Sequence, residues 1–586
     1  MTTETKTDKS KSFVRSLCAG EIEQDVLFPY PELDPDARET LVQVLDAIDS
    51  LLGDREADFR AWDAAGEMPK AFLEELRQFG LFGLIVPEEH GGLNLGNMAY
   101  SRVLQQIARH DASVALTIGA HSSIGMRGLK LFGTDEQKQR YYDKLATGEM
   151  IAAFCLTEPG AGSDAASLRT RAEEQKDGSY ILNGSKIWIT NGGIADFFTV
   201  FAKTGDLQER GRLSAFIVTR DMEGVSVSEH EDKMGIRASS TTSVFFEDVK
   251  VPKENLLGPP NNGFKVAMNI LNAGRSGLGG GCVGGMKGLI KRATQHATER
   301  KQFGQAIGEF GLIKQKIGHM IVDCYAAEAC VTVVAALYDS GYTDSSVEAA
   351  ISKVFATEAL WRTADEALQI AGGSGYMREL PYERVMRDCR INRIFEGTNE
   401  ILRLYIALTA LNDVGRSLRE MSSSLKGIFD DPIKGFGVLY EYAARRAAWA
   451  TGVGARAHTL SMVHLALRPQ AEMFEDLTRD LAGMVDRILR KHGKNIIGKQ
   501  LASRRLADVM IDLFVLACTF SRVTHSIEAK GVDAAAKEID IARVLAGQVH
   551  GRVTRNFRKI DDNDDELVKD LATHAYEAEG YSWDTI

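Results

Sequence analysis

Four short segments hold residue types that could take part in chemistry. The first, CLTEPGAGSDAAS at 155–167, places glycines and hydroxyl side chains within a few residues. Glycines let a ligand approach the backbone closely, and hydroxyl and N–H groups can bond a polar, anionic molecule. The second, KIWITNGG at 186–193, puts Trp188 close to Thr190. Beside a ligand loop this indole could stack on a planar ring, whereas a lone Trp is more often part of the core.

The third and fourth segments add a glycine cradle and a carboxylate. In QIAGGSGYMRELPYERVMRD, 369–388, Gln369 and the glycines after a helical stretch could hold a pyrophosphate. A helix C-cap followed by a turn is the structural alternative. In RIFEGTNEILRLYIAL, 393–408, Glu396 directly precedes a glycine and an apolar helix. Its carboxylate could act as a base or could only cap the helix as an N-terminal anion.

Changes in hydrophobic period predict the elements that must position these segments. Helical periodicity alternates with a region of short, β-branched and aromatic runs separated by turn residues. The sequence predicts an α+β fold with a middle antiparallel β-domain. The expected parts are an N-terminal extension (1–35), an N-terminal α-domain (36–150), the β-domain (151–258), a C-terminal α-domain (259–410), a Ser-rich linker (411–440) and an additional helical domain (441–586).

Composition excludes several classes of protein. The 586 residues carry a net charge of −11, which argues against nucleic-acid binding because that requires a basic surface. Seven scattered cysteines without CxxC or metal-ligand spacing favour a reduced compartment and no metal site. No apolar run of about 18 residues is expected to span a membrane. The polar start resembles neither a signal nor a transit peptide, so a bacterial cytoplasmic location is expected, with the inner-membrane face and the mitochondrial matrix as alternatives.

One motif would indicate a different enzyme. GGGCVG at 279–284 satisfies the GxGxxG pattern of dinucleotide-binding folds. That fingerprint must follow a strand, however, and this segment follows the helical KVAMNILNAGR. We therefore predict that these glycines allow close helix packing, and we do not expect an NAD-dependent dehydrogenase.

Taken together, the segments resemble the acyl-CoA dehydrogenase family. The segments 155–167 and 369–388 match the two signature patterns of that family at every constrained position. KIWITNGG, ERKQFG at 299–304 and IFEGTNEILR follow in the family's order. The resemblance covers about 36–410 and continues through FPYPEL and the helical tail, as in the very-long-chain and complex I-assembly branch.

The resemblance implies FAD as the cofactor and a homodimer as the assembly. Trp188 and Thr190 are expected beside the isoalloxazine ring, and Arg300, Gln369 and the nearby glycines across the dimer interface. The expected flavin contacts are Phe154, Leu156, Thr157, Gly162, Ser163, Trp188, Thr190, Arg300, Phe303, Gln369, Gly372, Gly373, Thr398, Asn399 and Glu400. The expected substrate contacts are Ser163, Asn272, Gly274, Arg275, Glu396 and Gly397.

The resemblance also implies the reaction, which is the α,β-dehydrogenation of an acyl-CoA thioester. Glu396 is expected to take the α-proton while flavin N5 accepts the β-hydride. The Glu396 N–H and a ribityl hydroxyl are expected to hold the thioester carbonyl. The stretch 272–277 holds no acid, so Glu396 has no competitor there. A dry site that raises the pKa of Glu396 is a prediction. Electrons are expected to pass to an electron-transfer flavoprotein.

Chain length and membrane contact are further expectations. The stretch 115–128 resembles the very-long-chain branch and is expected to open a long channel, for chains of about C12 or more, at Gly119, Ala120, Gly125 and Gly128. The segment 437–467 carries Arg445, Arg446 and Arg456 beside aromatic residues. It could contact an anionic membrane or be a solvated helix face.

Two other functions stay open at this point. One branch with this architecture also assists respiratory-complex assembly, so a scaffold with residual activity is the alternative from a different class. An acyl-CoA oxidase is the alternative enzyme, and it differs in how the reduced flavin reacts with oxygen.

Overall fold

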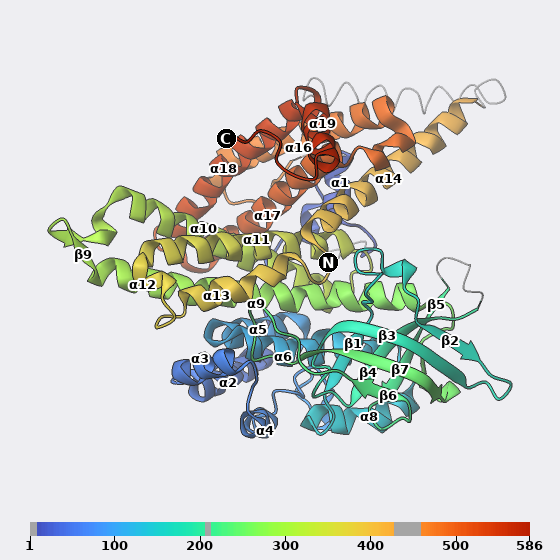
Figure 1. The fold of residues 1–586 in the computed structure, drawn as a ribbon. Coiled ribbons are helices and arrows are strands. Elements are labelled where there is room, and N and C mark those ends of the chain that lie inside the picture. Colours follow the sequence, from blue (N-terminus) through green and yellow to red (C-terminus); the bar gives the residue numbers. More distant parts are fainter. Residues whose placement is uncertain (1–8, 206–211, 427–458, 586) are drawn as a thin grey trace, which may run out of the picture. The chain divides into compact units, whose positions relative to one another are not determined.

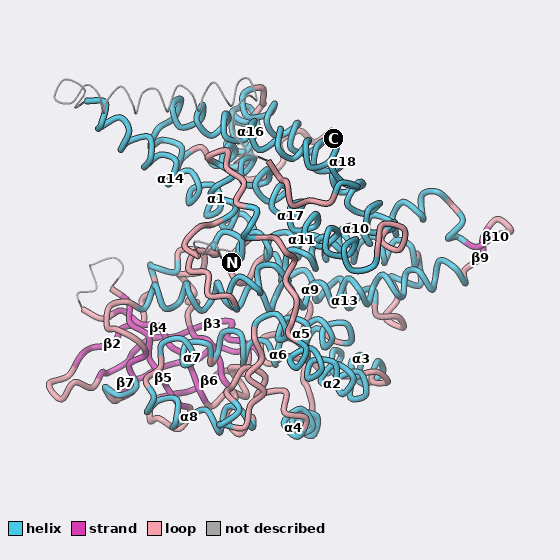
Figure 2. The backbone as a smooth tube through the Cα atoms, turned by 180° about the vertical axis from the view of Figure 1, so that it is seen from behind, coloured by secondary structure: helices cyan, strands magenta, loops and turns pink. Residues whose placement is uncertain are grey.

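A computed structural model describes residues 9–205, 212–426 and 459–585. The chain folds into two compact units, which Figures 1 and 2 show from opposite sides. We call the described residues of 9–10 and 30–399 the core unit, and those of 11–29 and 400–585 the tail unit.

The core unit begins with a group of helices. Their bounds are α2 Pro35–Leu52, α3 Glu56–Ala65, α4 Lys70–Gln78, α5 Asn97–His110, α6 Ala112–Gly119, the π-helix η3 Ala120–Gly125, α7 Arg127–Phe132 and α8 Asp135–Thr147. The Asp34 side chain caps α2 by accepting a 2.9 Å hydrogen bond from the N–H of Ala37, and Pro35 follows at the first helical position. The apolar faces of these helices share one buried core.

A mixed sheet follows these helices. Its strands are β1 Ala152–Cys155, β2 Arg171–Glu174, β3 Tyr180–Thr190, β4 Phe197–Lys203, β5 Leu213–Thr219, β6 Val225–Val227, β7 Thr241–Val251 and β8 Leu256–Leu257. The strand order is β6-β7-β3-β2-β4-β5-β8, and β1 pairs with β4. Alternate residues of β4 point into two different cores. Phe197 and Phe201 join the helical core, whereas Phe198 and Val200 lie in the core of the sheet's other face.

The predicted α+β fold is confirmed, but the sheet is not wholly antiparallel. Strand β4 pairs in parallel with both β1 and β2. The remaining pairs, including the long β3–β7 pair, are antiparallel. Alternation of apolar residues indicates which face of a strand is buried, but it carries no information on the direction of the neighbouring strand.

Long helices form the rest of the core unit. Their bounds are α9 Gly263–Glu299, α10 Gly311–Asp339, α11 Ser346–Ala371, α12 Gly373–Tyr376, α13 Tyr382–Cys389 and the 3-10 turn η7 Arg390–Arg393, with a small hairpin of β9 Lys301–Gln302 and β10 Gln305–Ala306. Helix α9 packs closely on α5, because a Cβ at Gly284 would lie 2.0 Å from the Gln105 carbonyl oxygen. A Cβ at Gly280 would lie 2.6 Å from the Ser101 carbonyl oxygen. The predicted packing role of the glycine-rich motif is confirmed at these two positions.

Helix α10 is apolar enough to raise the question of a membrane span. Its 18-residue window has a mean hydropathy of 1.8, although no such run was expected from the sequence. However, 72% of that window is buried inside the protein, as in the core helix of a globular domain.

The tail unit corrects two sequence-based boundaries. Its helices are α1 Phe13–Cys18, α14 Asn399–Lys426, α16 Arg468–His492, α17 Gln500–Lys530, α18 Ala536–Asp561 and α19 Asp565–Glu577. Residues 1–35 were expected to be only an extension, yet α1 is buried among the tail helices, and Figure 1 shows it in blue among the orange and red ribbons. The linker expected from residue 411 is wrong at its start, because α14 continues to Lys426. Residues 427–458, which include most of the expected membrane segment 437–467, lie outside the described residues.

Candidate active site

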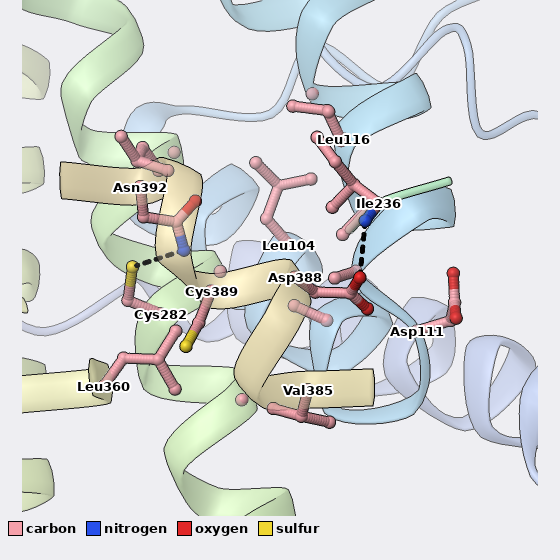
Figure 3. A pocket seen from close by; sticks show the side chains of 18 of the residues that line it. Leu104, Asp111, Leu116, Ile236, Cys282, Leu360, Val385, Asp388, Cys389 and Asn392 are labelled. Atoms are coloured by element: carbon pink, nitrogen blue, oxygen red, sulfur yellow. Dashed lines mark hydrogen bonds between the residues drawn. The ribbon is translucent and has the colours of Figure 1, made fainter. Parts of the chain in front are cut away.

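A narrow cavity of about 150 Å³ runs through the helices of the core unit. Figure 3 shows Leu104, Leu116, Leu360 and Val385 pointing into it from different helices. The sequence-predicted residues Thr190, Gly274 and Glu396 line the same cavity. The structure therefore brings the end of strand β3, helix α9 and the candidate base to one apolar space.

Glu396 lies in the turn between η7 and α14. It has a φ of +58°, and Gly397 follows with a φ of +86°, so the backbone reverses sharply at the carboxylate. The Glu396 Oε2 atom is buried and makes no hydrogen bond to any residue that the structure describes. Burial raises the pKa of Glu396, while the positive charges of Arg275 and Lys353 act in the opposite direction.

Lys353 fixes the turn that carries this carboxylate. It lies on α11 and is fully buried. Its Nζ donates hydrogen bonds to the Gly397 carbonyl oxygen at 2.9 Å and to Asn399 Oδ1 at 2.8 Å. Burial lowers the pKa of Lys353 to about 8, opposed by the negative charge of Glu396. Sequence reasoning missed this residue, although a lysine between Ile351 and Phe355 on the buried face of an apolar helix was a usable signal.

The glycine loop after β1 (155–167) is fixed by hydrogen bonds of Glu158, whereas its glycines face open space. Glu158 accepts hydrogen bonds from Lys186 Nζ at 2.7 Å and from the Thr170 N–H at 3.0 Å, and it is 6% exposed. A Cβ built at Gly160 or Gly162 would meet nothing within 4 Å. The loop is thus anchored to β3 and presents an open backbone surface to a ligand.

The α6–η3 segment contributes only part of what was expected. Gly119 and Ala120 line the cavity, as does Ala115. Gly125 and Gly128 do not, which corrects the prediction for them. A Cβ at Gly125 would lie 2.8 Å from Ala152 atoms. A Cβ at Gly128 would lie 2.9 Å from the Leu257 side chain. Both glycines therefore serve packing against the sheet.

Sequence comparisons place these features in a known family. Models of the N-terminal, middle and C-terminal domains of acyl-CoA dehydrogenases match residues 39–149, 153–249 and 261–411. The human mitochondrial very long-chain specific acyl-CoA dehydrogenase is 43% identical over 528 residues, covering 89% of this chain and 80% of the human protein. The chain belongs to the acyl-CoA dehydrogenase family. The model of the ACAD9/ACADV C-terminal domain also matches the tail of this acyl-CoA dehydrogenase, over 465–581.

Solved structures agree with this assignment. An acyl-CoA dehydrogenase from Bacillus anthracis, complexed with FAD, is 31% identical with a TM-score of 0.79, covering 95% of this chain and 94% of that chain. A chain in the structure titled as the electron transferring flavoprotein of Acidaminococcus fermentans is 36% identical with a TM-score of 0.61, covering 64% and 98%. The chain is an acyl-CoA dehydrogenase, and FAD is its cofactor.

One group of the expected flavin residues fits that cofactor within a single chain. Trp188, near the end of strand β3, has a φ of +56° and is 64% exposed, so the ring is free to stack. Thr157, Gly162 and Ser163 lie on the open loop, and Thr190 lies at the cavity wall. Phe154 is on β1 and partly buried, and Leu156 directly follows β1 and is buried.

A second group lies apart from the cavity. Arg300 and Phe303 belong to the β9–β10 hairpin region, and Phe303 is 95% exposed. Gln369 lies in the last turn of α11. Gly372 has a φ of +60°, and a Cβ there would meet nothing within 4 Å, as at Gly373. Figure 1 shows the hairpin and α12 toward the same end of the long helices. None of these residues lines the described cavity, so one chain does not bring the two groups together.

Of the remaining predicted residues, some line the cavity and others form hydrogen bonds within the protein. Gly274 lines the cavity, whereas Arg275 donates a 2.5 Å hydrogen bond to Asn272. Thr398 lies in the Glu396 turn, and Glu400 begins the tail unit. The Asn399 side chain is fully buried and bonded to α11, so it positions the turn instead of facing a ligand. Within the described ranges, no three His, Cys, Asp or Glu side chains group as a metal site.

Proposed function

We propose that this acyl-CoA dehydrogenase oxidises long-chain acyl-CoA to trans-2-enoyl-CoA, the first step of β-oxidation, with Glu396 as the base. The observation that carries the proposal is the Glu396 carboxylate in the wall of an apolar cavity that also includes Thr190, with its Oε2 atom buried and unbonded to any described residue. An unbonded carboxylate in a dry site is available to accept a proton from a substrate carbon.

The residues around Glu396 set its state and position. Burial favours the neutral acid, so the facing charges of Arg275 and Lys353 help to keep the carboxylate ionised before the reaction. The positive φ values at Glu396 and Gly397 direct the turn, and Lys353 holds it. The Glu396 N–H is the proposed donor to the thioester carbonyl, because a fixed dipole there stabilises the developing enolate. Bound FAD supplies the two-electron acceptor that protein side chains lack.

The expected residue sets are proposed as binding contacts. Ser163 and the α9 positions Asn272, Gly274 and Arg275 are proposed to face the CoA thioester, as the family resemblance implies. The exposed group at Arg300, Phe303, Gln369, Gly372 and Gly373 is proposed to meet the flavin of a second copy in a homodimer. Its exposure and its separation from the cavity support that assignment.

Chain length, electron partner and location are also proposals. Small residues at Ala115, Gly119 and Ala120 leave the cavity open, which supports long acyl chains. The similarity to a chain in a structure titled as an electron transferring flavoprotein supports that class of partner. The expected cytoplasmic location, with the mitochondrial matrix as the alternative, stays a prediction. Membrane contact through 437–467 also stays a prediction.

Anaerobic mixing of the purified protein with palmitoyl-CoA and with octanoyl-CoA tests this function. We expect palmitoyl-CoA to bleach the visible absorbance of bound FAD faster, and an electron-transfer flavoprotein to restore it. Faster bleaching by octanoyl-CoA would contradict the long-chain assignment and leave the enzyme assignment intact. Rapid reoxidation by air alone would indicate an oxidase. FAD that neither substrate bleaches would favour the scaffold function.

A further inference from the structure

The cavity continues far beyond the candidate base along one face of α9. Gly274, Gly281 and Gly288 all line it. Since an α-helix rises about 1.5 Å per residue, these 14 residues span about 21 Å, with Gly281 roughly midway. The distal half is walled by Leu360 on α11 and Val385 on α13, among others (Figure 3). This half lies past the α6 positions that the sequence singled out.

Gly281 differs from its glycine neighbours in what a side chain would meet. A Cβ at Gly280 or Gly284 would collide with backbone oxygens of α5. A Cβ at Gly281 would meet only the Ala108 Cβ, at 3.8 Å, which is an ordinary contact. Ala108 also lines the cavity. The absence of a side chain at Gly281 is therefore not required for helix packing, and its effect is to leave the cavity open.

The distal end of the cavity changes from apolar to charged. Arg384, Asp111 and Asp388 line it and are 5%, 6% and 4% exposed. Arg384 Nη1 lies 3.7 Å from Asp111 Oδ2 and makes no hydrogen bond within the described part of the chain. Its Nη2 donates a 2.8 Å hydrogen bond to Glu56. A hydrocarbon end placed here would bury these polar groups without giving them partners, which is unfavourable.

We propose that Gly281 sets the acyl length that this enzyme accepts, and that the ω half of a long saturated chain fills the space between α9 and α13 up to the Arg384–Asp111 pair. The inference rests on the proposed function and names its substrate class further. Each methylene buried in this half strengthens transition-state binding about fourfold, so long saturated chains gain most.

Substitutions at Gly281 test the proposal. Gly281→Ala adds one methyl group at a permitted distance, and Gly281→Leu fills the midpoint of the channel. We expect Gly281→Leu to lower kcat/KM for palmitoyl-CoA and eicosanoyl-CoA at least about 50-fold, the equivalent of three lost methylenes, while octanoyl-CoA changes less than about threefold. Gly281→Ala should also lower kcat/KM for the long substrates relative to octanoyl-CoA, by a smaller factor. Gly547→Leu, at an exposed helical glycine of the tail unit with open space around it, is the matched control.

The outcomes separate this inference from the proposed function. An unchanged chain-length profile in Gly281→Leu, or an equal loss at every length, would overturn the role of Gly281. If Gly281→Leu fails to retain FAD, Gly281→Ala becomes the deciding variant. An unchanged ratio of eicosanoyl-CoA to octanoyl-CoA turnover in Gly281→Ala would likewise overturn the role of Gly281. Absence of turnover in the wild-type protein would instead contradict the proposed function.

Discussion

The Glu396 carboxylate lies where burial opposes its charge and two cations favour it. Its pKa is raised because desolvation outweighs Arg275 and Lys353. The base must be ionised, so we expect kcat/KM to rise with pH through this pKa and then to reach a plateau. The rise should lie above the range in which an exposed Glu titrates, about pH 4.3. A pH profile with palmitoyl-CoA checks this, and a rise at the ordinary Glu value would contradict it.

A second prediction at the scale of single residues concerns Lys353. In Lys353→Met the Gly397 carbonyl and Asn399 lose their donor, and Glu396 loses a facing positive charge. We expect kcat to fall about tenfold, as for loss of about 1.4 kcal/mol of transition-state stabilisation. We also expect the acidic limb of the pH profile to move to higher pH, which a purely structural role would not cause.

Lys130 provides the control for that variant. It is a partly buried lysine that also donates to a backbone carbonyl, that of Ile85, at 2.7 Å. It does not line the cavity. Lys130→Met should lower thermal stability and leave the pH profile in place. If both variants shift the profile equally, Lys353 has no specific effect on Glu396.

At the scale of elements, one ion pair joins the glycine loop to strand β3. Lys186 is fully buried, 2.7 Å from Glu158. Lys186→Met leaves that carboxylate buried without its counter-charge, which typically costs about 3–5 kcal/mol. We expect a lower melting temperature and less FAD per chain, measured by visible absorbance. Adding Glu158→Gln removes the charge and keeps an acceptor oxygen for one of the two N–H groups of Arg169 and Thr170, so the double variant should recover part of both losses. No recovery would mean that the pair is not the anchor.

The elements were predictable from the sequence to different degrees. The helical and β regions and the chemistry-bearing turns followed from period and turn residues, because these signals are local. The function of individual glycines did not. Gly125 and Gly128 pack against the sheet, Gly280 and Gly284 pack against α5, and Gly281 opens the cavity. The sequence does not distinguish these glycines, because the role of each depends on which neighbouring element a side chain would contact.

At the scale of the whole molecule, the N-terminal segment belongs with the helices at the other end of the chain. Phe13 on α1 is fully buried, with its ring 6.0 Å from that of Phe514 on α17. Leu27 accepts a 2.5 Å hydrogen bond from Ser521. The sequence placed residues 1–35 outside the fold, because its polar and Pro-rich character is visible locally while a partner some 500 residues away is not. The end of α14 was also misjudged, since the Ser-rich last turns of this helix have the composition of a linker.

This packing predicts that the tail unit depends on α1. Phe13→Ala should lower the unfolding free energy of that unit by about 3–5 kcal/mol, through lost burial and the cavity that remains. Hydrogen exchange of the α17 amides measures this. Tyr581→Ala, at a side chain that is 78% exposed in the same unit, should change it by less than about 0.5 kcal/mol. Equal effects of the two substitutions would contradict the contribution of α1.

The central claim, that Glu396 takes the α-proton, is tested most directly by the rate of FAD reduction in Glu396→Gln. The variant keeps the shape of the turn and removes the basic group. With FAD content unchanged, we expect anaerobic reduction by palmitoyl-CoA to slow by about 10²–10⁴-fold, the usual contribution of a positioned general base. Reduction at the wild-type rate would contradict the account, because another group would then have to remove the proton.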